Sequence, residues 1–407
     1  MTHLNYLEKL LDGEIVEWIA LGDVTLIKTG QAVSKQAIST NPGQYPVINS
    51  GKEPLGFIDK WNTDNDPIGI TTRGAGVGSI TWQEGKYFRG NLNYSVTIKD
   101  SANLEVRYLY HLLHQMQSAI QSLCTFDGIP ALNAGSLKGL EIPIPCPDNP
   151  EKSLEIQAEI VRILDAFTAM TAELTAELTA ELNLRKKQYN YYRDQLLSFE
   201  EGEVEWKTLG DLTTDKFWIM PATPKFDENE DVPYITSKNI RGGDIFFDKV
   251  KFISRDDFNN LSRNRPILAG DFLISMIGTI GEIARVKKTD LDFYGQNMYL
   301  IRLDESLLHS GYFLHFFDSP KMKSHFNAVK NNSGQGYLKA NNIDCISVPV
   351  PSLSEQKRIA AILDKFDALT NSITEGLPRE IELRQKQYEY YRDLLLSFPK
   401  SHSDEAA

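Results

Sequence analysis

The feature that most constrains the fold is a stretch of 43 residues that occurs twice. Residues 157–199 align with residues 356–398 without a gap, at a constant offset of 199, and 24 of the 43 aligned positions are identical. Both copies space apolar residues three or four positions apart, which is the pattern of an amphipathic helix. A stretch of domain length with glycine, proline and aromatic residues precedes each copy. The sequence therefore predicts two tandem units, each a globular module followed by a helix.

The first predicted helix is too long for the core of one compact domain. Residues 155–199 contain no glycine or proline, and at 1.5 Å per residue a helix of this length spans roughly 65–70 Å. Part of it must therefore bridge between bodies. Asn149-Pro150 and the Ser352/Glu355 pair are helix start signals. The second copy contains Gly376-Leu377-Pro378, where we expect a kink or a break.

Composition limits the class of protein. With 407 residues, 41% hydrophobic and 24% charged, the chain can bury two ordinary cores. It has no apolar run of membrane-spanning length, and residues 1–13 lack the pattern of a signal peptide, so we expect a cytoplasmic protein without a membrane partner. The three cysteines do not form a CxxC pair, which argues against a disulfide framework. Because the net charge is −12, any DNA-facing surface must be a local patch.

The two modules repeat one order of elements. Short β-prone runs such as YPVINSG and YSVTIKD alternate with Gly, Pro and Asn, and a helix follows near Val106 to Leu123 in the first module and near Ser310 to Val329 in the second. This predicts an α+β fold with two mixed, sheet-rich modules. The predicted division is 1–13 (N-terminal helical segment), 14–150 (module 1), 151–202 (central helix), 203–352 (module 2), 353–399 (second helix) and 400–407 (disordered tail).

The beginning of the chain resembles the end of a repeated helix. The segment NYLEKLLDGEIVEWIALGD echoes YYRDQLLSFEEGEVEWKTLGD at 191–211, apart from a difference of two residues in length. We expect the start of the chain to pack beside its end, because a closed arrangement of the two repeated units, with two-fold-like symmetry, would place them together. An amphipathic start that simply packs on module 1 is the alternative.

No catalytic or metal site is indicated. The run Arg73 to Gly78 leads into strand-like residues and not into a helix, so we interpret it as a tight turn and not as a phosphate-binding loop. The P-loop signature is absent. His111 and His114 have no acidic or cysteine partners close in sequence, which favours packing over metal binding. We therefore predict no catalytic residue, cofactor site or metal site in this chain.

The ends of the two helices keep their residues where neighbouring positions diverge. A solvated polar face is one explanation, but such a face tolerates many residue combinations, so we favour a contact surface. Aromatic and arginine side chains are typical of buried interface centres. The predicted interface residues are Arg185, Lys187, Tyr189, Tyr192, Arg193, Arg384, Lys386, Tyr388, Tyr391 and Arg392.

Three consecutive TAEL units occupy residues 171–174, 175–178 and 179–182. Helical low complexity is the simple interpretation. However, four residues add about 6 Å and a net turn of about 40° to a helix, and they keep Leu nearly on one stripe. A unit can thus be gained or lost without breaking the helix.

These segments together resemble a known family. The IPIPCP and VPVPS segments, followed by helices that open QAEIVRILDAF or QKRIAAILDKF and end YYRDQLLSF or YYRDLLLSF, closely resemble the DNA-specificity subunit of Type I restriction-modification systems. The TAEL units resemble the IC subgroup. The resemblance implies two target recognition domains, each reading one half of a bipartite asymmetric site in double-stranded DNA. The two helices would form an antiparallel coiled-coil spacer with pseudo-two-fold symmetry.

The same resemblance implies a non-enzymatic subunit with catalytic partners. Two adenine-N6 methyltransferase subunits would bind S-adenosylmethionine, and ATP-dependent restriction and translocation subunits would use ATP and Mg²⁺. Consistently, the chain has no Asn-Pro-Pro-Tyr tetrapeptide. Two alternatives stay open. A coiled-coil adaptor predicts no dependence on DNA sequence, and a solitary methyltransferase predicts cofactor binding by this chain alone.

Base contacts are expected from polar and basic loop residues, because Arg, Lys, Asn and Gln side chains can read base edges. In module 1 the predicted residues are Lys28, Gln31, Lys52, Arg73, Asn91 and Asn93. In module 2 they are Lys238, Asn239, Arg241, Gln296, Gln335 and Lys339.

Overall fold

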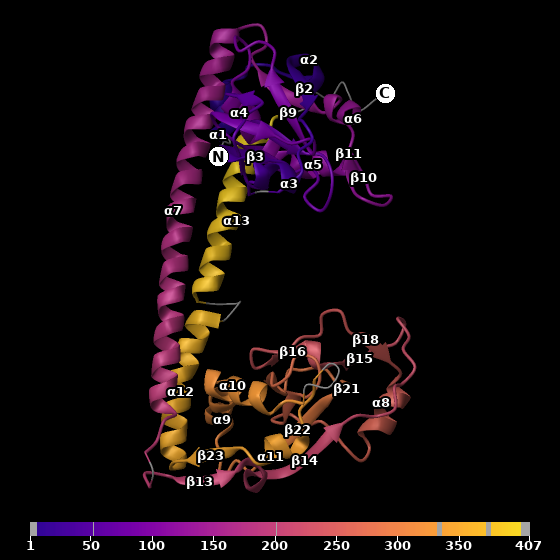
Figure 1. Ribbon diagram of the computed structural model, residues 1–407, viewed down its shortest axis with the longest axis vertical. Coiled ribbons are helices and arrows are strands. Elements are labelled where there is room, and N and C mark those ends of the chain that lie inside the picture. The colour runs from indigo at the N-terminus through magenta and orange to yellow at the C-terminus, as the bar shows by residue number, and fades with distance from the viewer. Residues whose placement is uncertain (1–5, 52, 201, 332–335, 372–375, 400–407) are drawn as a thin grey trace. The chain divides into compact units, whose positions relative to one another are not determined.

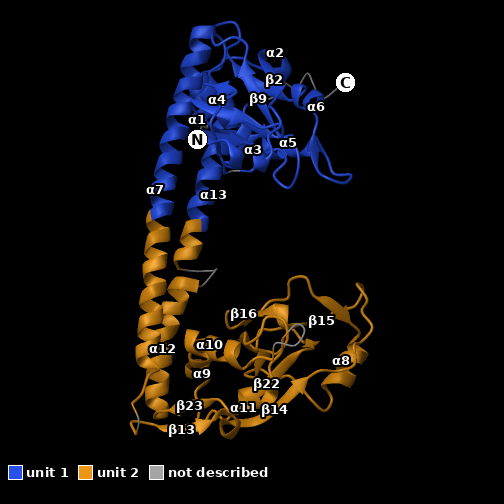
Figure 2. Cartoon of the chain, viewed as in Figure 1, with its two compact units in different colours: residues 1–176, 382–407 blue, residues 177–381 orange. Residues whose placement is uncertain are grey.

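The computed structural model describes residues 6–51, 53–200, 202–331, 336–371 and 376–399 (Figure 1). Two compact units divide the chain (Figure 2): unit 1 contains residues 1–176 and 382–407, and unit 2 contains residues 177–381. Each unit therefore combines one module with parts of the long helices. The predicted tail, residues 400–407, lies outside the described residues.

The long helices differ in continuity. The first copy is a single helix, α7 (Pro150–Leu196), whereas the second copy is described as α12 (Leu353–Asn371) and α13 (Leu377–Leu396). Residues 372–375 lie outside the described residues. Gly376 has a φ of 81°, a left-handed conformation that glycine adopts without strain. Pro378 then stands in the first turn of α13, where its missing N–H costs nothing.

Unit 1 contains two four-stranded sheets. The first has the order β2-β9-β6-β7 and is antiparallel throughout; the second has the order β4-β3-β8-β5, with β3 and β8 parallel. A separate ribbon pairs β1 with β12 and sets Trp18 opposite Pro143. The strands are β1 (Val16–Ala20), β2 (Thr25–Thr29), β3 (Pro42–Ile48), β4 (Phe57–Ile58), β5 (Thr63–Asp64), β6 (Ile68–Thr71), β7 (Ile80–Trp82), β8 (Lys86–Arg89), β9 (Asn93–Ile98), β10 (Cys124–Thr125), β11 (Ala131–Leu132) and β12 (Glu141–Pro145).

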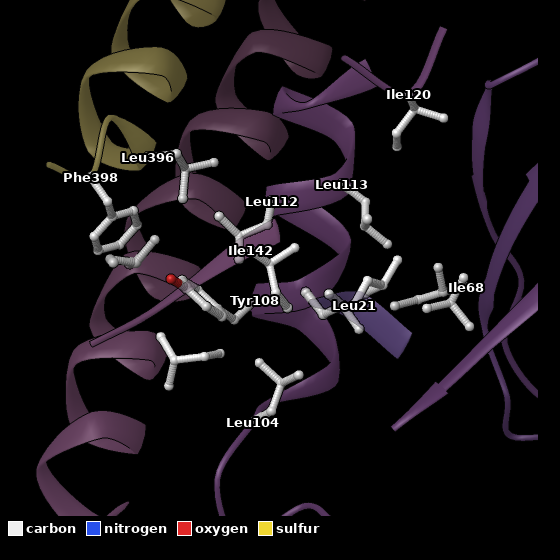
Figure 3. Close-up of a cluster of buried hydrophobic side chains, with 14 of the residues drawn as sticks. Leu21, Ile68, Leu104, Tyr108, Leu112, Leu113, Ile120, Ile142, Leu396 and Phe398 are labelled. Atoms are coloured by element: carbon white, nitrogen blue, oxygen red, sulfur yellow. The ribbon is translucent and has the colours of Figure 1, made fainter. Parts of the chain in front are cut away.

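The core of unit 1 brings together distant parts of the chain. Tyr108 and Leu112 of α4 pack with Leu396 and Phe398 from the end of the chain (Figure 3). Leu7 and Leu11 of α1 belong to the same cluster, so the first described helix shares one core with the end of α13 and with Phe398 after it, as the sequence echo predicts. The other helices of unit 1 are short. The bounds are α1 (Tyr6–Leu11), α2 (Leu21–Val24), α3 (Lys35–Thr40), α4 (Val106–Gln115), α5 (Gln117–Ser122) and α6 (Ala134–Lys138).

Unit 2 repeats this topology. Its main sheet has the order β14-β22-β19-β20, a smaller sheet has the order β18-β15-β21 with β15 and β21 parallel, and β13 pairs with β23 so that Trp206 lies opposite Pro349. The strands are β13 (Glu205–Thr208), β14 (Thr213–Ile219), β15 (Val232–Ile235), β16 (Ile240–Arg241), β17 (Asp244–Ile245), β18 (Lys251–Ile253), β19 (Phe272–Ser275), β20 (Ile283–Arg285), β21 (Tyr294–Gly295), β22 (Met298–Leu303) and β23 (Ser347–Val350).

The remaining helices of unit 2 are short. They are η1 (Leu209–Leu212), η2 (Ser237–Asn239), α8 (Arg255–Ser262), α9 (Ser310–Phe317), α10 (Pro320–Val329) and α11 (Ala340–Asp344). The α+β class and the sheet-rich modules predicted from the sequence are thus confirmed. No helix in the described part of the chain is long and apolar enough to cross a membrane.

Candidate functional site

A buried glutamine fixes each module to the helix that follows it. In unit 1 the side chain of Gln157 donates from Nε2 to the carbonyl of Asn103 (3.1 Å) and accepts at Oε1 from the N–H of Glu105 (2.9 Å). In unit 2 Gln356 makes the same pair of bonds, to the carbonyl of Leu307 (3.0 Å) and from the N–H of His309 (2.7 Å). Because both glutamines are fully buried and use both ends of the amide, they set the position of α4 on α7 and of α9 on α12.

A histidine–aspartate pair adds a second repeated link. His111 Nε2 lies 2.8 Å from Asp165 Oδ1, and His315 Nε2 lies 2.7 Å from Asp364 Oδ1. Burial lowers the pKa of His111 and outweighs the opposing effect of its bond to Asp165. The pKa of Asp165 is lowered, because bonds from Arg107 and His111 outweigh the effect of burial. His111 thus has a packing role, and no group of three or more potential metal ligands is found among the described residues.

Part of the predicted interface lies inside unit 2. Tyr189 and Arg193 are only 6% and 4% exposed. The hydroxyl of Tyr189 lies 3.0 Å from His315 Nδ1, and Tyr192 stacks on Phe366 with ring centroids 5.5 Å apart. Packing within the chain therefore explains why these positions recur, and a partner surface is not needed to explain them.

The equivalent residues in unit 1 are held less tightly. Tyr391 stacks on Phe167 at 5.5 Å, and the Tyr388 hydroxyl accepts a bond from Thr168 at 3.1 Å. Arg392 donates to Asp393. Of the other predicted residues, Arg185 bonds Glu181 and Gln188, Arg384 bonds Gln387, Lys386 pairs with Glu382, and Lys187 is exposed.

The outer face of each helix end carries a repeated apolar stripe. Leu184 and Tyr191 are 59% and 62% exposed, and their counterparts Leu383 and Tyr390 are 43% and 63% exposed. The two members of each pair stand seven residues apart, on one helix face. We call Leu184, Lys187 and Tyr191 tail face 1, and Leu383, Lys386 and Tyr390 tail face 2. The two tyrosines belong to the recurring helix-end residues for which the sequence predicts a contact surface, whereas the two leucines were not predicted, although their spacing was visible in the sequence.

Several loops of unit 1 meet at one end of its first sheet. The N–H of Gln31 donates to the carbonyl of Arg89 (2.9 Å), and the N–H of Thr72 donates to the carbonyl of Leu92 (2.9 Å). The N–H of Leu92 also donates to Asn49 Oδ1 (2.9 Å). These bonds bring together loop cluster 1, which we define as residues 30–34, 49–51, 72–79 and 90–92. Gln31, Arg73 and Asn91 are exposed in it, and Lys28 is exposed on the adjoining strand β2.

The glycine run in this cluster is a tight turn, as predicted. Gly74 and Gly78 have φ values of 93° and 79°, and the N–H of Gly78 returns to the carbonyl of Thr71 at 2.8 Å. The run therefore reverses the chain between β6 and β7 and presents Arg73 at the surface.

One predicted base contact in module 1 needs correction. Asn93 is fully buried, and its Oδ1 accepts a bond from Arg89 at 2.6 Å, so it has a structural role. Arg89 was not predicted at all. It is 3% exposed and donates to the carbonyls of Asp66 (2.6 Å) and Ile68 (3.0 Å), which ties β8 to the first sheet. Burial lowers the pKa of this guanidinium. Lys52 lies outside the described residues.

Unit 2 brings equivalent loops together. Thr279 Oγ1 donates to the carbonyl of Ser237 (2.9 Å), Ile277 forms a β-bridge with Tyr337, and the N–H of Gln296 donates to the carbonyl of Ile235 (3.2 Å). Lys238 and Lys339 are exposed at these loops, and Gln296 is half-buried.

The other predicted residues of module 2 differ in their surroundings. Arg241 is exposed, stacks on Phe246 at 3.9 Å and pairs with Asp248 at 3.2 Å. Asn239 is 8% exposed; its Nδ2 donates to the carbonyl of Phe246 (2.9 Å) and its Oδ1 accepts from the N–H of Thr236 (3.0 Å). Its predicted base contact is therefore replaced by a capping role. Gln335 lies outside the described residues.

Comparison with known proteins gives consistent matches along the chain. The family model "Type I restriction modification DNA specificity domain" matches residues 14–184 and 201–383. The Escherichia coli "Type I restriction enzyme EcoR124I/EcoR124II specificity subunit" is 39% identical over 423 residues, which cover 98% of each protein. A putative type I restriction enzyme specificity subunit of Haemophilus influenzae is 33% identical over 404 residues, covering 97% of this chain and 98% of the relative.

A solved structure shares the fold. A chain from the work titled "Structural basis underlying complex assembly and conformational transition of the type I R-M system" matches with a TM-score of 0.62 at 14% identity. The match covers 94% of this chain and 97% of the solved chain. At this identity the likeness supports the fold alone.

Proposed function

Because this chain belongs to the Type I restriction modification DNA specificity family, we propose that it recognises DNA for such a system and that each unit reads one half of a bipartite asymmetric site. The family predicted from the sequence is confirmed, whereas the IC subgroup stays a prediction. The coiled-coil adaptor is disfavoured, because the family match includes both modules and not the helices alone.

The observation that supports two readers is the repeated loop arrangement. In each unit a glycine turn joins two antiparallel strands of the main sheet: β6 to β7 in unit 1, and β19 to β20 in unit 2, where Gly278 and Gly281 have φ values of 85° and 80°. A second loop follows the parallel strand pair of each unit. Side chains that can hydrogen-bond base edges lie in these loops or on the adjoining strands, and all of them except the half-buried Gln296 are exposed. The residues that we retain as base contacts are Lys28, Gln31, Arg73 and Asn91 in unit 1, and Lys238, Arg241, Gln296 and Lys339 in unit 2.

In this proposal, partner subunits supply part of the contacts to the DNA phosphates. A net charge of −12 is unfavourable for binding phosphates alone, so we assign part of the phosphate contacts to methyltransferase subunits. Tail faces 1 and 2 present the same leucine, lysine and tyrosine on two helices. Two equivalent surfaces suit two copies of one methyltransferase subunit.

Catalysis in this proposal belongs to the partners. The methyltransferase subunits bind S-adenosylmethionine, and the restriction and translocation subunits use ATP and Mg²⁺. This chain supplies recognition without a catalytic group of its own. Because the proposed function requires access to DNA, we place this chain in the cytoplasm.

A selection experiment tests the proposed function. The chain is assembled with the methyltransferase of its own system, and bound duplexes are enriched from a random pool and sequenced. We expect one bipartite consensus with a gap of fixed length. Methyltransferase without this chain is the control and should enrich nothing. An adaptor would give no consensus, and a solitary methyltransferase would transfer a labelled methyl group to DNA without any partner.

A further inference from the structure

A small hairpin of unit 1 exposes two large apolar side chains. Phe126 and Ile129, between β10 and β11, are 64% and 69% exposed. Gly128 between them has a φ of 93°, so the chain reverses there in a conformation that suits glycine. We call residues 126–129 the hairpin tip. The strands β10 and β11 lie on the side of unit 1 away from α7 (Figure 1).

The base of this hairpin is held firmly. Cys124 and Leu132 are 8% and 3% exposed and belong to the core of unit 1. The N–H of Gly74 donates to the carbonyl of Pro130 (2.9 Å), and the N–H of Leu132 donates to the carbonyl of Thr72 (2.8 Å). The tip therefore projects from a fixed base, directly beside the turn that presents Arg73.

The position of the tip indicates its partner. It is continuous with loop cluster 1, where Gln31, Arg73 and Asn91 are the proposed base contacts. A two-stranded ribbon fits the major groove of B-DNA. The only apolar group that a base edge presents there is the C5-methyl of thymine, which Phe side chains are known to contact. Asp127 is also exposed at the tip and repels phosphate oxygens, which argues against seating the tip on the backbone.

We propose that the hairpin tip enters the major groove and that Phe126 and Ile129 contact the C5-methyl of a thymine in the half-site read by unit 1. This inference rests on the proposed function and deepens it. Polar loop residues read hydrogen-bonding groups, and the tip adds apolar recognition of one base. Burying the methyl also removes exposed apolar surface of the two side chains from water.

Replacing thymine by uracil tests the contact directly, because uracil lacks only the methyl group. Binding of the assembled complex is measured on its selected site with each thymine of the unit 1 half-site replaced in turn. One replacement should weaken wild-type binding about fourfold, the equivalent of roughly 0.8 kcal/mol for one buried methyl. The variants Phe126→Ala and Ile129→Ala should bind the thymine site about tenfold more weakly and should discriminate less between thymine and uracil.

Matched controls come from unit 1 itself. Ile15 is 69% exposed and Phe57 is 53% exposed, and neither lies in loop cluster 1. Ile15→Ala and Phe57→Ala should bind and discriminate like wild type. Melting temperatures of all four variants should match wild type, since the replaced side chains are exposed.

The outcomes separate this inference from the proposed function. A complex that enriches no consensus at all contradicts the proposed function. A complex with a consensus, but with no sensitivity to uracil in either strand of the unit 1 half-site, overturns the inference alone. Tip variants that discriminate between thymine and uracil as fully as wild type also overturn it, whether or not their affinity for DNA falls.

Discussion

Replacing Tyr189 by phenylalanine should destabilise unit 2 by removing one buried hydrogen bond. His315 Nε2 lies 2.7 Å from Asp364, so in the neutral ring this nitrogen carries the proton and donates to the carboxylate. His315 Nδ1 is then an acceptor, and the Tyr189 hydroxyl donates to it at 3.0 Å. Tyr189→Phe keeps the ring and leaves that buried acceptor without its donor.

The magnitude follows from the burial. Leaving a buried polar group without its partner costs about 1–3 kcal/mol, and the aromatic packing of Tyr189 on Phe366 is retained. We expect a loss of about 1–2 kcal/mol in the free energy of unfolding of unit 2. For a unit of this size, that lowers the melting temperature by roughly 2–8 °C.

The matched control is the equivalent tyrosine of the second helix. Tyr388 is half-buried in unit 1 and accepts a bond from Thr168, which also donates to the carbonyl of Leu164. Tyr388→Phe should therefore cost less than about 0.5 kcal/mol, at the low end for a single hydrogen bond. Scanning calorimetry and urea titration of wild type and both variants measure the difference. Equal effects of the two substitutions, or no effect of Tyr189→Phe, would refute the reasoning.

Three further predictions concern recognition, spacing and pH. Arg73→Ala or Arg241→Ala should weaken DNA binding by about 1–3 kcal/mol and relax base preference only in the half-site of its own unit. Binding to DNA with altered half-sites measures both effects, and unchanged affinity and base preference would remove both assignments. Deleting Thr175–Leu178 shortens α7 by about 6 Å and turns it by about 40°, close to the roughly 35° of one base pair, so methylation-site mapping should show a gap one pair shorter; an unchanged gap with normal activity contradicts the prediction. Burial lowers the pKa of His111, so unit 1 should lose stability as the pH falls below about 6.5, and His111→Gln should reduce this loss in melting curves between pH 7 and 5.5.

The repeated helices were the most predictable part of the fold. Their period, their start signals and the Gly376-Leu377-Pro378 interruption all act locally, so the sequence alone shows where helices begin and where α13 starts anew. The packing of the helix ends was not predictable. Tyr189 follows module 1 in the chain but packs in unit 2, because tertiary contacts, and not chain order, decide which core a helix end joins. The domain division made from the sequence treats the long helices as segments of their own and stays a prediction. The compact units instead divide α7 after residue 176.

The candidate site was predictable by residue type and not by orientation. Arg73 and Asn91 flank glycines in exposed loops, whereas Asn93, two residues further along, points into the core and bonds Arg89. Asn91 lies in the loop before β9, whereas Asn93 is the first residue of β9 and faces the core, and residue type alone does not distinguish the two positions. Asn239 is buried for a similar reason, because its amide caps a turn that sequence reasoning did not identify. Phe126 and Ile129 were overlooked because apolar residues are usually assigned to the core.

Exchange of one module tests most directly the central claim that each unit reads its own half-site. Residues 16–147 are replaced by the corresponding segment of a relative with a different recognition site, and Gln157, which fixes the module to α7, is kept. Methylation sites of the assembled complex are then mapped on genomic DNA. The account predicts that only the half-site read by unit 1 changes, while the gap and the other half-site are retained. A hybrid that is active but altered in both half-sites would contradict it.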